Sequence, residues 1–230
     1  MRFDPPLVPA RLLRRYKRFL ADVVLDGREV TVHCPNPGAM LGLATPDSEV
    51  WLAPTRTKLP YRWVLTRVAT GLVGIDTNLP NRLVRDAILA GAIPELSGYA
   101  TLAAEVRYST NSRIDLLLSD PGRPPAYVEV KNVHLKRGSA AEFPDWVTTR
   151  GAKHLGDLAA EVARGHRAVM VYLVQRDDCS HFTLAKDLDP GYARAFAQAR
   201  AAGVEALCYA THVTSDGIEV AGPLPVSEDA

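Results

Sequence analysis

Alternating apolar and polar residues run through the first third of the chain in several short segments. Such alternation predicts strands, because successive side chains of a strand point to opposite faces of a sheet. Asp26-Gly27 separates two of the segments and is typical of a hairpin turn. The expected strands are Lys17–Leu25, Arg28–His33, Glu49–Ala53, Tyr61–Ala69 and Leu72–Asp76. Short strands in this number, without a convincing helix, predict a five-stranded closed barrel of the OB type over residues 1–80.

The periodicity changes from strand to helix just after this segment. Apolar residues then recur at helical spacing as far as Gly91, at Leu83, Val84, Ala87 and Ile88. A second helix is expected from Asp145, acting as its N-cap, to about Arg164, and a third over 190–202. The remaining segments of the chain are expected to supply the strands on which these helices pack.

Those strands are expected at Leu102–Tyr108, Arg113–Ser119, Ala126–Val133, Arg167–Val174 and Val204–Tyr209. A turn over 109–112 joins the first two, and the polar stretch Asn132–Phe143 is expected to be a mobile loop. A hairpin turn at Asp216-Gly217 follows the last strand. The order of strands and helices predicts a mixed α/β sheet over residues 81–230.

Two carboxylates and a lysine gather on one predicted hairpin of this sheet. Glu129 and Lys131 are two residues apart, so a strand points both to the same face. If the hairpin pairs about Gly122, Asp115 lies opposite Glu129. Oxygen ligands of this kind, Asp115 and Glu129, suit Mg²⁺ or Mn²⁺, and Lys131 could orient a water or stabilise charge on a phosphate. The alternative is an exposed strand whose Glu and Lys form a solvated face.

This arrangement has the form of the PD-(D/E)xK nuclease core, with an acid in one strand and Glu-x-Lys in the next. The second strand precedes a helix, and such strands are usually interior to a sheet. A charge at an interior position is costly unless it has a partner or a metal. The position of Glu129 therefore favours a functional site over a solvated face.

Basic residues concentrate in two other segments. A strip near the N-terminus has Tyr16 and Phe19 interleaved, and is a candidate for contacting phosphates and stacking on bases, through Arg11, Arg14, Arg15, Lys17 and Arg18. On the second helix, Arg150 and Lys153 share a face with His154 and Asp157, and could face a phosphate held by the hairpin. The alternative for the strip is a solvated strand or turn. The alternative for the second helix is an ordinary amphipathic helix whose polar face is exposed to water.

Composition excludes several other classes. The 230 residues are 47% hydrophobic and carry a net charge of +1, so nucleic-acid binding must depend on local clusters. No apolar run approaches the roughly 20 residues of a membrane span, and no signal-peptide core is present, so a cytoplasmic protein is expected. Cys34, Cys179 and Cys208 form no C-x-x-C pair, and zinc, P-loop and dinucleotide motifs are absent. His33, Cys34 and Asn36 could form a site, but such residues more often hold a turn together.

Several separated stretches resemble the sugar fermentation stimulation protein A family when taken together. They include HCPNPGAM, EVRYSTNSRIDLLL, YVEVKNV and FPDWVTTRGAKHL. The resemblance implies an OB-fold domain, a PD-(D/E)xK nuclease-like domain, sequence-nonspecific DNA binding and a regulatory role in sugar (maltose) metabolism. It places the acidic positions on Asp115 and Glu129 and the lysine on Lys131. The chain departs from the family at Pro37, where Thr is expected, and at Asn132-Val-His134.

Three functions are compatible with the sequence. The first is a DNA-binding protein with a Mg²⁺- or Mn²⁺-dependent phosphodiesterase site, and the second is a catalytically inactive DNA-binding regulator on the same scaffold. The third is a small-molecule enzyme or sugar-binding protein, which would use exposed tryptophans among Trp51, Trp63 and Trp146. We expect DNA as the partner and no membrane, and we allow for a homodimer.

Overall fold

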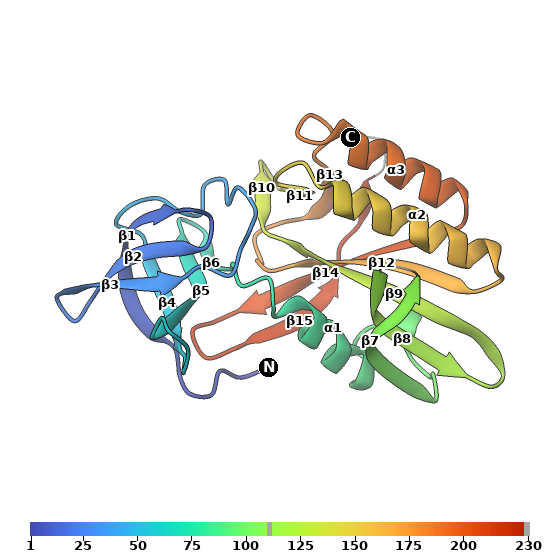
Figure 1. Cartoon of the computed structure of the whole chain (residues 1–230), viewed down its shortest axis with the longest axis horizontal. Helices are drawn as coiled ribbons and strands as arrows, with labels where there is room; N and C mark the ends of the chain where they lie inside the picture. The colour runs from blue at the N-terminus through green and yellow to red at the C-terminus, as the bar shows by residue number, and fades with distance from the viewer. Residues whose placement is uncertain (110–111, 228–230) are drawn as a thin grey trace.

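A closed β-barrel forms the first lobe of the molecule (Figure 1), which the computed structural model describes over residues 1–109 and 112–227. Its strands are β1 (Val8–Tyr16), β2 (Leu20–Leu25), β3 (Arg28–His33), β4 (Glu49–Pro54), β5 (Tyr61–Val68) and β6 (Gly71–Gly74). They follow the order β3-β2-β1-β4-β5-β6, and a pairing between β3 and β5 closes the barrel. Leu12, Leu52 and Trp63 fill its interior. The predicted OB-like barrel is confirmed.

The strand β1 was not predicted as one element. Including β1 changes which five strands close the barrel. Its inward positions, Ala10 and Leu12, alternate with outward cations, so the apolar periodicity covers only a short run. The barrel is closed by β1 to β5. The predicted fifth strand is β6, a short strand added at the end of the sheet beyond β5.

A mixed six-stranded sheet forms the second lobe, as predicted, in the order β15-β14-β12-β9-β8-β7. Its strands are β7 (Thr101–Ser109), β8 (Ser112–Asp120), β9 (Arg123–Val133), β12 (Arg167–Val174), β14 (Glu205–Val213) and β15 (Ile218–Pro223). The central strands β9, β12 and β14 are parallel, and the outer pairings are antiparallel. The register of β8 and β9 is the one predicted about Gly122, with Leu116 opposite Val128 and Leu118 opposite Ala126. The predicted turn over 109–112 includes two residues, 110–111, outside the described residues.

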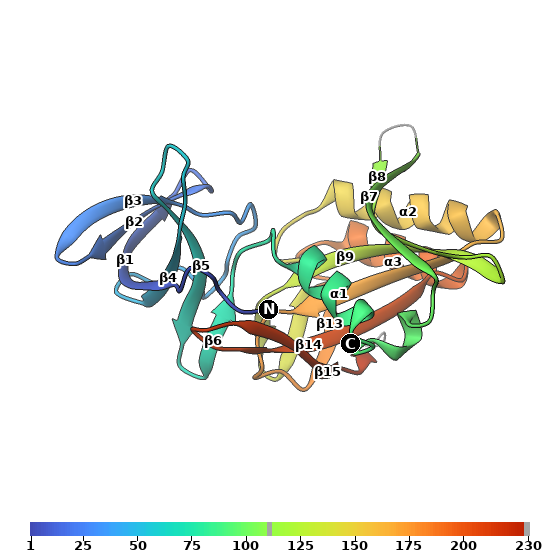
Figure 2. The same cartoon turned by 90° about the horizontal axis from the view of Figure 1, so that it is seen from below.

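Helices cover both faces of this sheet (Figure 2). One face packs on α1 (Pro80–Leu89) and on the short 3-10 helix η1 (Pro94–Leu96), which share a core with Val128, Val130 and Val171. The other face packs on α2 (Thr149–Ala163) and α3 (Pro190–Ala201), around Met170 and Tyr172. No helix of the described chain is both long and apolar enough to cross a membrane.

A second, smaller sheet occupies part of the chain expected to be a loop. It joins β10 (Leu135–Arg137), β11 (Ala140–Phe143), β13 (His181–Leu184) and β16 (Val226–Ser227). The prediction of a mobile loop at Asn132–Phe143 is therefore wrong, because β11 pairs in parallel with a strand 41 residues further along the chain. Asp145 is also not the N-cap of α2, since Thr148 accepts the capping hydrogen bond from the Gly151 N–H.

The chain crosses between the two lobes twice. Arg2 forms a β-bridge with Gly217, just before β15 of the second lobe, and the Met1 amine donates to the Ile218 carbonyl at 2.7 Å. The chain then enters the barrel and returns to the second lobe through Ile75, just before α1. The predicted division near residue 80 coincides with the start of α1, and two autonomous domains stay a prediction.

Close contacts seal the seam between the lobes. The loop after β3 places Gly38 against Asp145, whose carboxylate accepts the Met40 N–H at 3.0 Å. Asp145 also contacts His134 Nε2 at 3.1 Å, so it is held from both sides. On β6, the Gly74 N–H donates to the Gln175 carbonyl at 2.8 Å. Hydrogen bonds from backbone N–H groups of the barrel lobe to acceptors of the second lobe therefore hold the two lobes together.

We expect Gly38→Ala to lower the free energy of unfolding by about 2 kcal/mol, because the new methyl would lie within 2.8 Å of the Asp145 carboxyl carbon. Gly156→Ala is the matched control: Gly156 lies in α2 with no atom within 4 Å of an added Cβ, and Ala favours helix by about 1 kcal/mol. Urea unfolding of both variants measures the difference. Equal stability of the two would contradict a tight seam at Gly38.

Candidate functional site

Asp115 lies where the strands β8 and β9 begin to separate. The ladder between them ends at Leu116 and Val128, and the Asp115 carboxylate then accepts the Val130 N–H at 2.8 Å. Its other oxygen accepts the side-chain amide of Asn81, from the first turns of α1, at 2.8 Å. Burial, followed by the nearby charge of Glu129, raises the pKa of Asp115 to about 6. An acid group with a pKa near neutrality is thus fixed at the edge of the strand pair.

Glu129 lies on the neighbouring strand β9 and is only 2% exposed. Its Oε1 accepts a hydrogen bond from Lys131 Nζ at 2.7 Å and contacts His154 Nδ1. Its Oε2 is buried without a hydrogen-bond partner among the described residues. Burial works to raise the pKa of Glu129, but the His154 hydrogen bond and the Lys131 charge outweigh burial and lower the pKa. The site therefore pairs an ionised Glu129 with an Asp115 of much higher pKa.

His154 is the main residue of this cluster that the sequence did not predict. Its spacing with Arg150 placed it on a wet helix face, whereas α2 turns it onto Glu129 and buries it. Arg150 Nε donates to His154 Nε2 at 3.3 Å, which assigns the His154 proton to Nδ1, toward Glu129. Helical periodicity shows that His154 and Arg150 are neighbours, but it cannot show that a carboxylate on another strand lies beneath them.

Arginines surround a hollow of about 380 Å³ that opens onto Asp115. Its walls include Arg107, Arg113 and Arg150, together with Glu105. Arg107 and Arg113 are directly opposite each other on β7 and β8, an unfavourable pairing of like charges unless an anion lies between them. Neither forms an ion pair with a residue in the described ranges. These two arginines were not predicted as site residues, although the predicted turn between their strands would have placed them side by side.

The other predicted basic residues divide between structural and exposed positions. Arg14 pairs with the buried Asp22 at 2.8 Å, and Arg15 donates to the Asn36 and Gly38 carbonyls at 2.8 and 2.9 Å. Arg11 donates to the Asp47 carbonyl at 2.9 Å.

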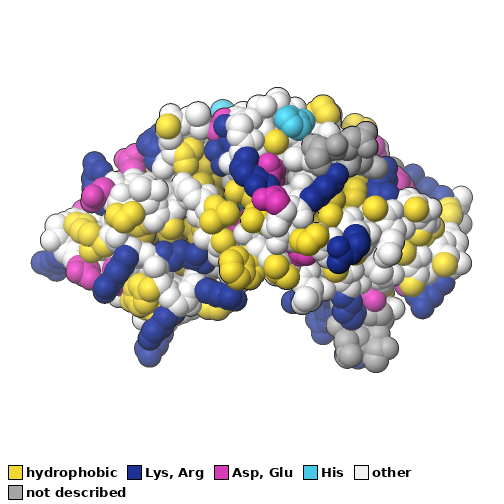
Figure 3. Space-filling model, turned by 90° about the horizontal axis from the view of Figure 1, so that it is seen from above, with side chains coloured by type: hydrophobic (Ala, Val, Ile, Leu, Met, Phe, Trp, Pro, Cys, Tyr) yellow, Lys and Arg dark blue, Asp and Glu magenta, His cyan; other side chains and the backbone are white. Residues whose placement is uncertain are grey.

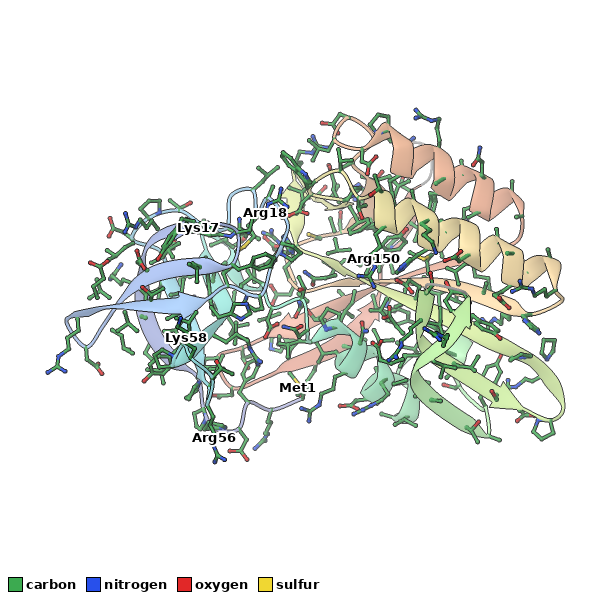
Figure 4. All side chains as sticks on the ribbon, in the orientation of Figure 1. Met1, Lys17, Arg18, Arg56, Lys58 and Arg150 are labelled. Carbon is green, nitrogen blue, oxygen red and sulfur yellow. The ribbon has the colours of Figure 1, made fainter. Side chains whose placement is uncertain are left out.

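Beyond these structural positions, Lys153 is held by Ser112 and Asp157, both at 2.6 Å. Arg11 and Arg14 are exposed although each has a partner, and Lys17 and Arg18, in the turn between β1 and β2, are exposed without an ion-pair partner in the described residues (Figure 4). Figure 3 shows lysines and arginines on both sides of the notch between the lobes.

The arrangement of Asp115 and Glu129 fits a hard divalent cation. Mg²⁺ is typically held by one or two carboxylates, with water and substrate phosphate completing the shell. The unpartnered Glu129 Oε2 is a free carboxylate oxygen of the kind such an ion needs. In the described ranges, no three His, Cys, Asp or Glu side chains converge as a closed metal cage. The residues therefore fit an open Mg²⁺-type site and not a closed structural one.

Comparison with known proteins places this geometry in a class and then in a family. The SfsA N-terminal OB domain matches residues 13–75, and the sugar fermentation stimulation protein RE domain matches residues 78–217. The fold is thus an OB barrel followed by an RE domain. The chain belongs to the sugar fermentation stimulation protein family.

Individual relatives match along their whole length. The sugar fermentation stimulation protein homolog of Dinoroseobacter shibae is 58% identical, covering 100% of this chain and 97% of that protein. The homolog of a Jannaschia species is 59% identical, covering 98% and 97%. The solved structure of Pyrococcus furiosus SfsA in complex with Ca²⁺ has a TM-score of 0.91 at 28% identity, covering 99% of this chain and 98% of that one.

We expect Asp115→Asn to change the pH dependence of stability in a chelating buffer. The folded-state pKa of Asp115 lies above its ordinary 3.8, so the protonated carboxyl stabilises the folded state relative to the ionised carboxylate. This stabilisation is lost as the pH rises from about 4 to about 6. Asn carries no charge, so relative to the wild type the variant should gain about 2 kcal/mol between pH ~4 and pH ~7.5. Urea unfolding at the two pH values measures this gain. An equal difference at both would contradict a raised pKa.

Proposed function

We propose that this protein binds DNA without sequence preference and hydrolyses phosphodiester bonds with the help of a divalent cation, Mg²⁺ or Mn²⁺. The observation that carries the proposal is Glu129: an ionised, buried carboxylate on an interior strand, with one oxygen held by Lys131 and His154 and the other unpartnered. A buried charge left in this condition is costly unless a cation takes the free oxygen. Asp115 lies one residue beyond the Leu116–Val128 pair and near enough to Glu129 for that charge to raise its pKa, so we assign it as the second carboxylate of such a site.

The residues of the site divide the work of hydrolysis. Asp115 and Glu129 would hold the cation, which supplies Lewis-acid polarisation of a phosphate oxygen and a water of lowered pKa. Lys131 Nζ, fixed 2.7 Å from Glu129, would stabilise charge developing on the phosphate or orient the attacking water. His154 would position Glu129 through its Nδ1–H. The Ca²⁺ bound by the Pyrococcus relative supports divalent-cation binding by this chain.

The charge distribution supports a nucleic acid as the substrate. Arg107, Arg113 and Arg150 line the hollow over Asp115, where a phosphate would relieve the repulsion between the two paired arginines. Exposed Lys17 and Arg18 extend the positive surface onto the barrel. Because the remaining arginines of the barrel strip have structural partners, we assign DNA contact there to these two. With DNA as the partner, we propose that the protein acts in the cytoplasm.

The second candidate is a DNA-binding regulator that no longer cleaves. It is favoured by the family name, sugar fermentation stimulation protein, which supports a regulatory role in sugar metabolism. The two candidates share the arginine hollow and differ only in turnover at Asp115 and Glu129. A sugar-binding site built on exposed tryptophans has less support, because Trp51 and Trp63 are buried in the barrel lobe and Trp146 alone of the three is exposed.

We expect titration calorimetry to detect Mg²⁺ or Mn²⁺ binding that Glu129→Gln weakens at least about tenfold, because the amide removes the charge and leaves the shape. Cleavage of single- and double-stranded DNA should require the cation and fall at least about a hundredfold in Glu129→Gln and Lys131→Met. Glu219→Gln, at an exposed acid on β15 at the opposite edge of the sheet, is the matched control and should retain both activities. Cation binding without cleavage of any DNA or RNA would establish the regulator instead.

We also expect Arg113→Ala to weaken DNA binding and to reduce the slope of log affinity against log salt by about one unit, because one phosphate contact is lost. Removing one of two opposed arginines should leave stability unchanged or slightly raised in the absence of DNA. Fluorescence anisotropy at several salt concentrations measures the slope. An unchanged slope would remove the arginine hollow from the DNA-binding surface.

A further inference from the structure

A pocket of about 280 Å³ opens at the seam between the two lobes. We call it the seam pocket. The barrel lobe contributes Arg18, Asn36 and Gly38, and the second lobe contributes Asn132, His134 and Trp146. It shares two elements with the carboxylate site, because Asn132 directly follows Lys131 on β9, and Trp146 precedes the first turn of α2, which carries Arg150. The pocket is thus close along the chain to the elements that carry Lys131 and Arg150.

Exposed apolar side chains collect around the seam pocket. Five large hydrophobic residues are exposed in the described chain, at Phe19, Leu41, Leu89, Trp146 and Val147. Trp146 and Val147 line the pocket. Phe19 follows the lining residue Arg18 in the chain. Leu41 follows Met40, whose N–H donates to the Asp145 carboxylate. Trp146 is 58% exposed, whereas Trp51 and Trp63 are 7% and 0% exposed. A solvent-exposed tryptophan at the mouth of a pocket indicates a binding surface for a flat apolar group.

The pocket lining carries one cation, Arg18, and one carboxylate, Asp145. Asp145 is the acidic residue of its lining, and its carboxylate is already used by His134 and the Met40 N–H. Burial works to raise the pKa of Asp145, but the His134 hydrogen bond outweighs burial and lowers the pKa. Arg18 lies at the side of the barrel that faces the second lobe (Figure 4) and forms no ion pair with a described residue. Aromatic surface beside an available cation is the combination that binds single-stranded nucleic acid.

We propose that the seam pocket receives one unpaired nucleobase, stacked on Trp146, from a strand whose backbone contacts Arg18. This deepens the proposed function, on which it rests, by naming single-stranded or locally unpaired nucleic acid as the preferred ligand. The volume is at the lower end for ligand sites and suits a single ring system. Asn132 and His134 are hydrogen-bonded to each other and to Gln175 and Asp145, so they fix one wall of the pocket and leave base stacking on Trp146 as the main contact. A second protein molecule fits less well, because the apolar residues are few and interrupted by Arg18.

The test compares a short oligothymidylate with an abasic oligonucleotide of equal length and phosphate number. Both are titrated into the full chain in a chelating buffer, so that no cleavage occurs, with tryptophan fluorescence and anisotropy as readouts. The wild type should bind oligothymidylate about tenfold more tightly than the abasic strand, with fluorescence quenching, because base stacking on an aromatic side chain contributes to affinity. Trp146→Ala should remove this preference and the quenching while keeping the affinity for the abasic strand.

Leu89→Ala is the matched control, because Leu89 is exposed on α1 and does not line the seam pocket. It should leave the base preference unchanged. Equal affinity of the wild type for both oligonucleotides, or a preference that survives in Trp146→Ala, would overturn the proposal. A dimer that sedimentation detects in the wild type and not in Trp146→Ala, without any base preference, would assign the surface to a second copy of the chain instead.

The result of the base-preference test can be distinguished from the result of the cleavage test of the proposed function. Base preference is measured without a cation and depends on Trp146, whereas cleavage depends on Glu129 and the cation. A preference that Trp146 controls, in a protein that never cleaves, would support the pocket and reject the nuclease. Cation-dependent cleavage by Trp146→Ala, with the wild type indifferent to bases, would reject the pocket alone.

Discussion

A single charge on an interior strand explains much of what surrounds it. Glu129 lies on β9, between β8 and β12, in a sheet with helices on both faces. Ionisation there is tolerated only because Lys131 and His154 reach one of its oxygens. His154 can do so only if α2 packs with that face toward the sheet, and Arg150 in turn fixes the ring. The ionised state of Glu129 on β9 therefore depends on how α2 packs against the sheet.

The same packing gives two neighbouring carboxylates, Asp115 and Glu129, different pKa values. Glu129 gains donors on its strand and from α2, while Asp115 gains mainly neutral donors, Asn81 and the Val130 N–H. Burial and the adjacent negative charge therefore act more strongly on Asp115. Two acids of different proton affinity at one place are a common property of sites that move protons or hold cations.

The sequence predicted features that depend on local pattern and missed those that depend on distant contact. The register about Gly122 follows from two apolar runs and one Pro-Gly turn, and it is confirmed as far as the pair Leu116 and Val128, next to Asp115 and Glu129. The strands β10 and β11 were missed because β11 pairs with β13, far along the chain. Asp145 has the residue type of an N-cap, but His134 and Met40 hold it instead. The role of His154 needed the tertiary fold, because its partner lies 25 residues away.

The double crossing between the lobes restricts how they can move. The segment leaving Met1 and the segment through Ile75 are separate covalent connections, each held at the second lobe (Figure 2). A single linker would let the barrel swivel in any direction, whereas two anchored connections define an axis and leave chiefly rotation about it. The seam hydrogen bonds act against that rotation as well, so the fold itself fixes the position of the barrel relative to the sheet that carries the carboxylates.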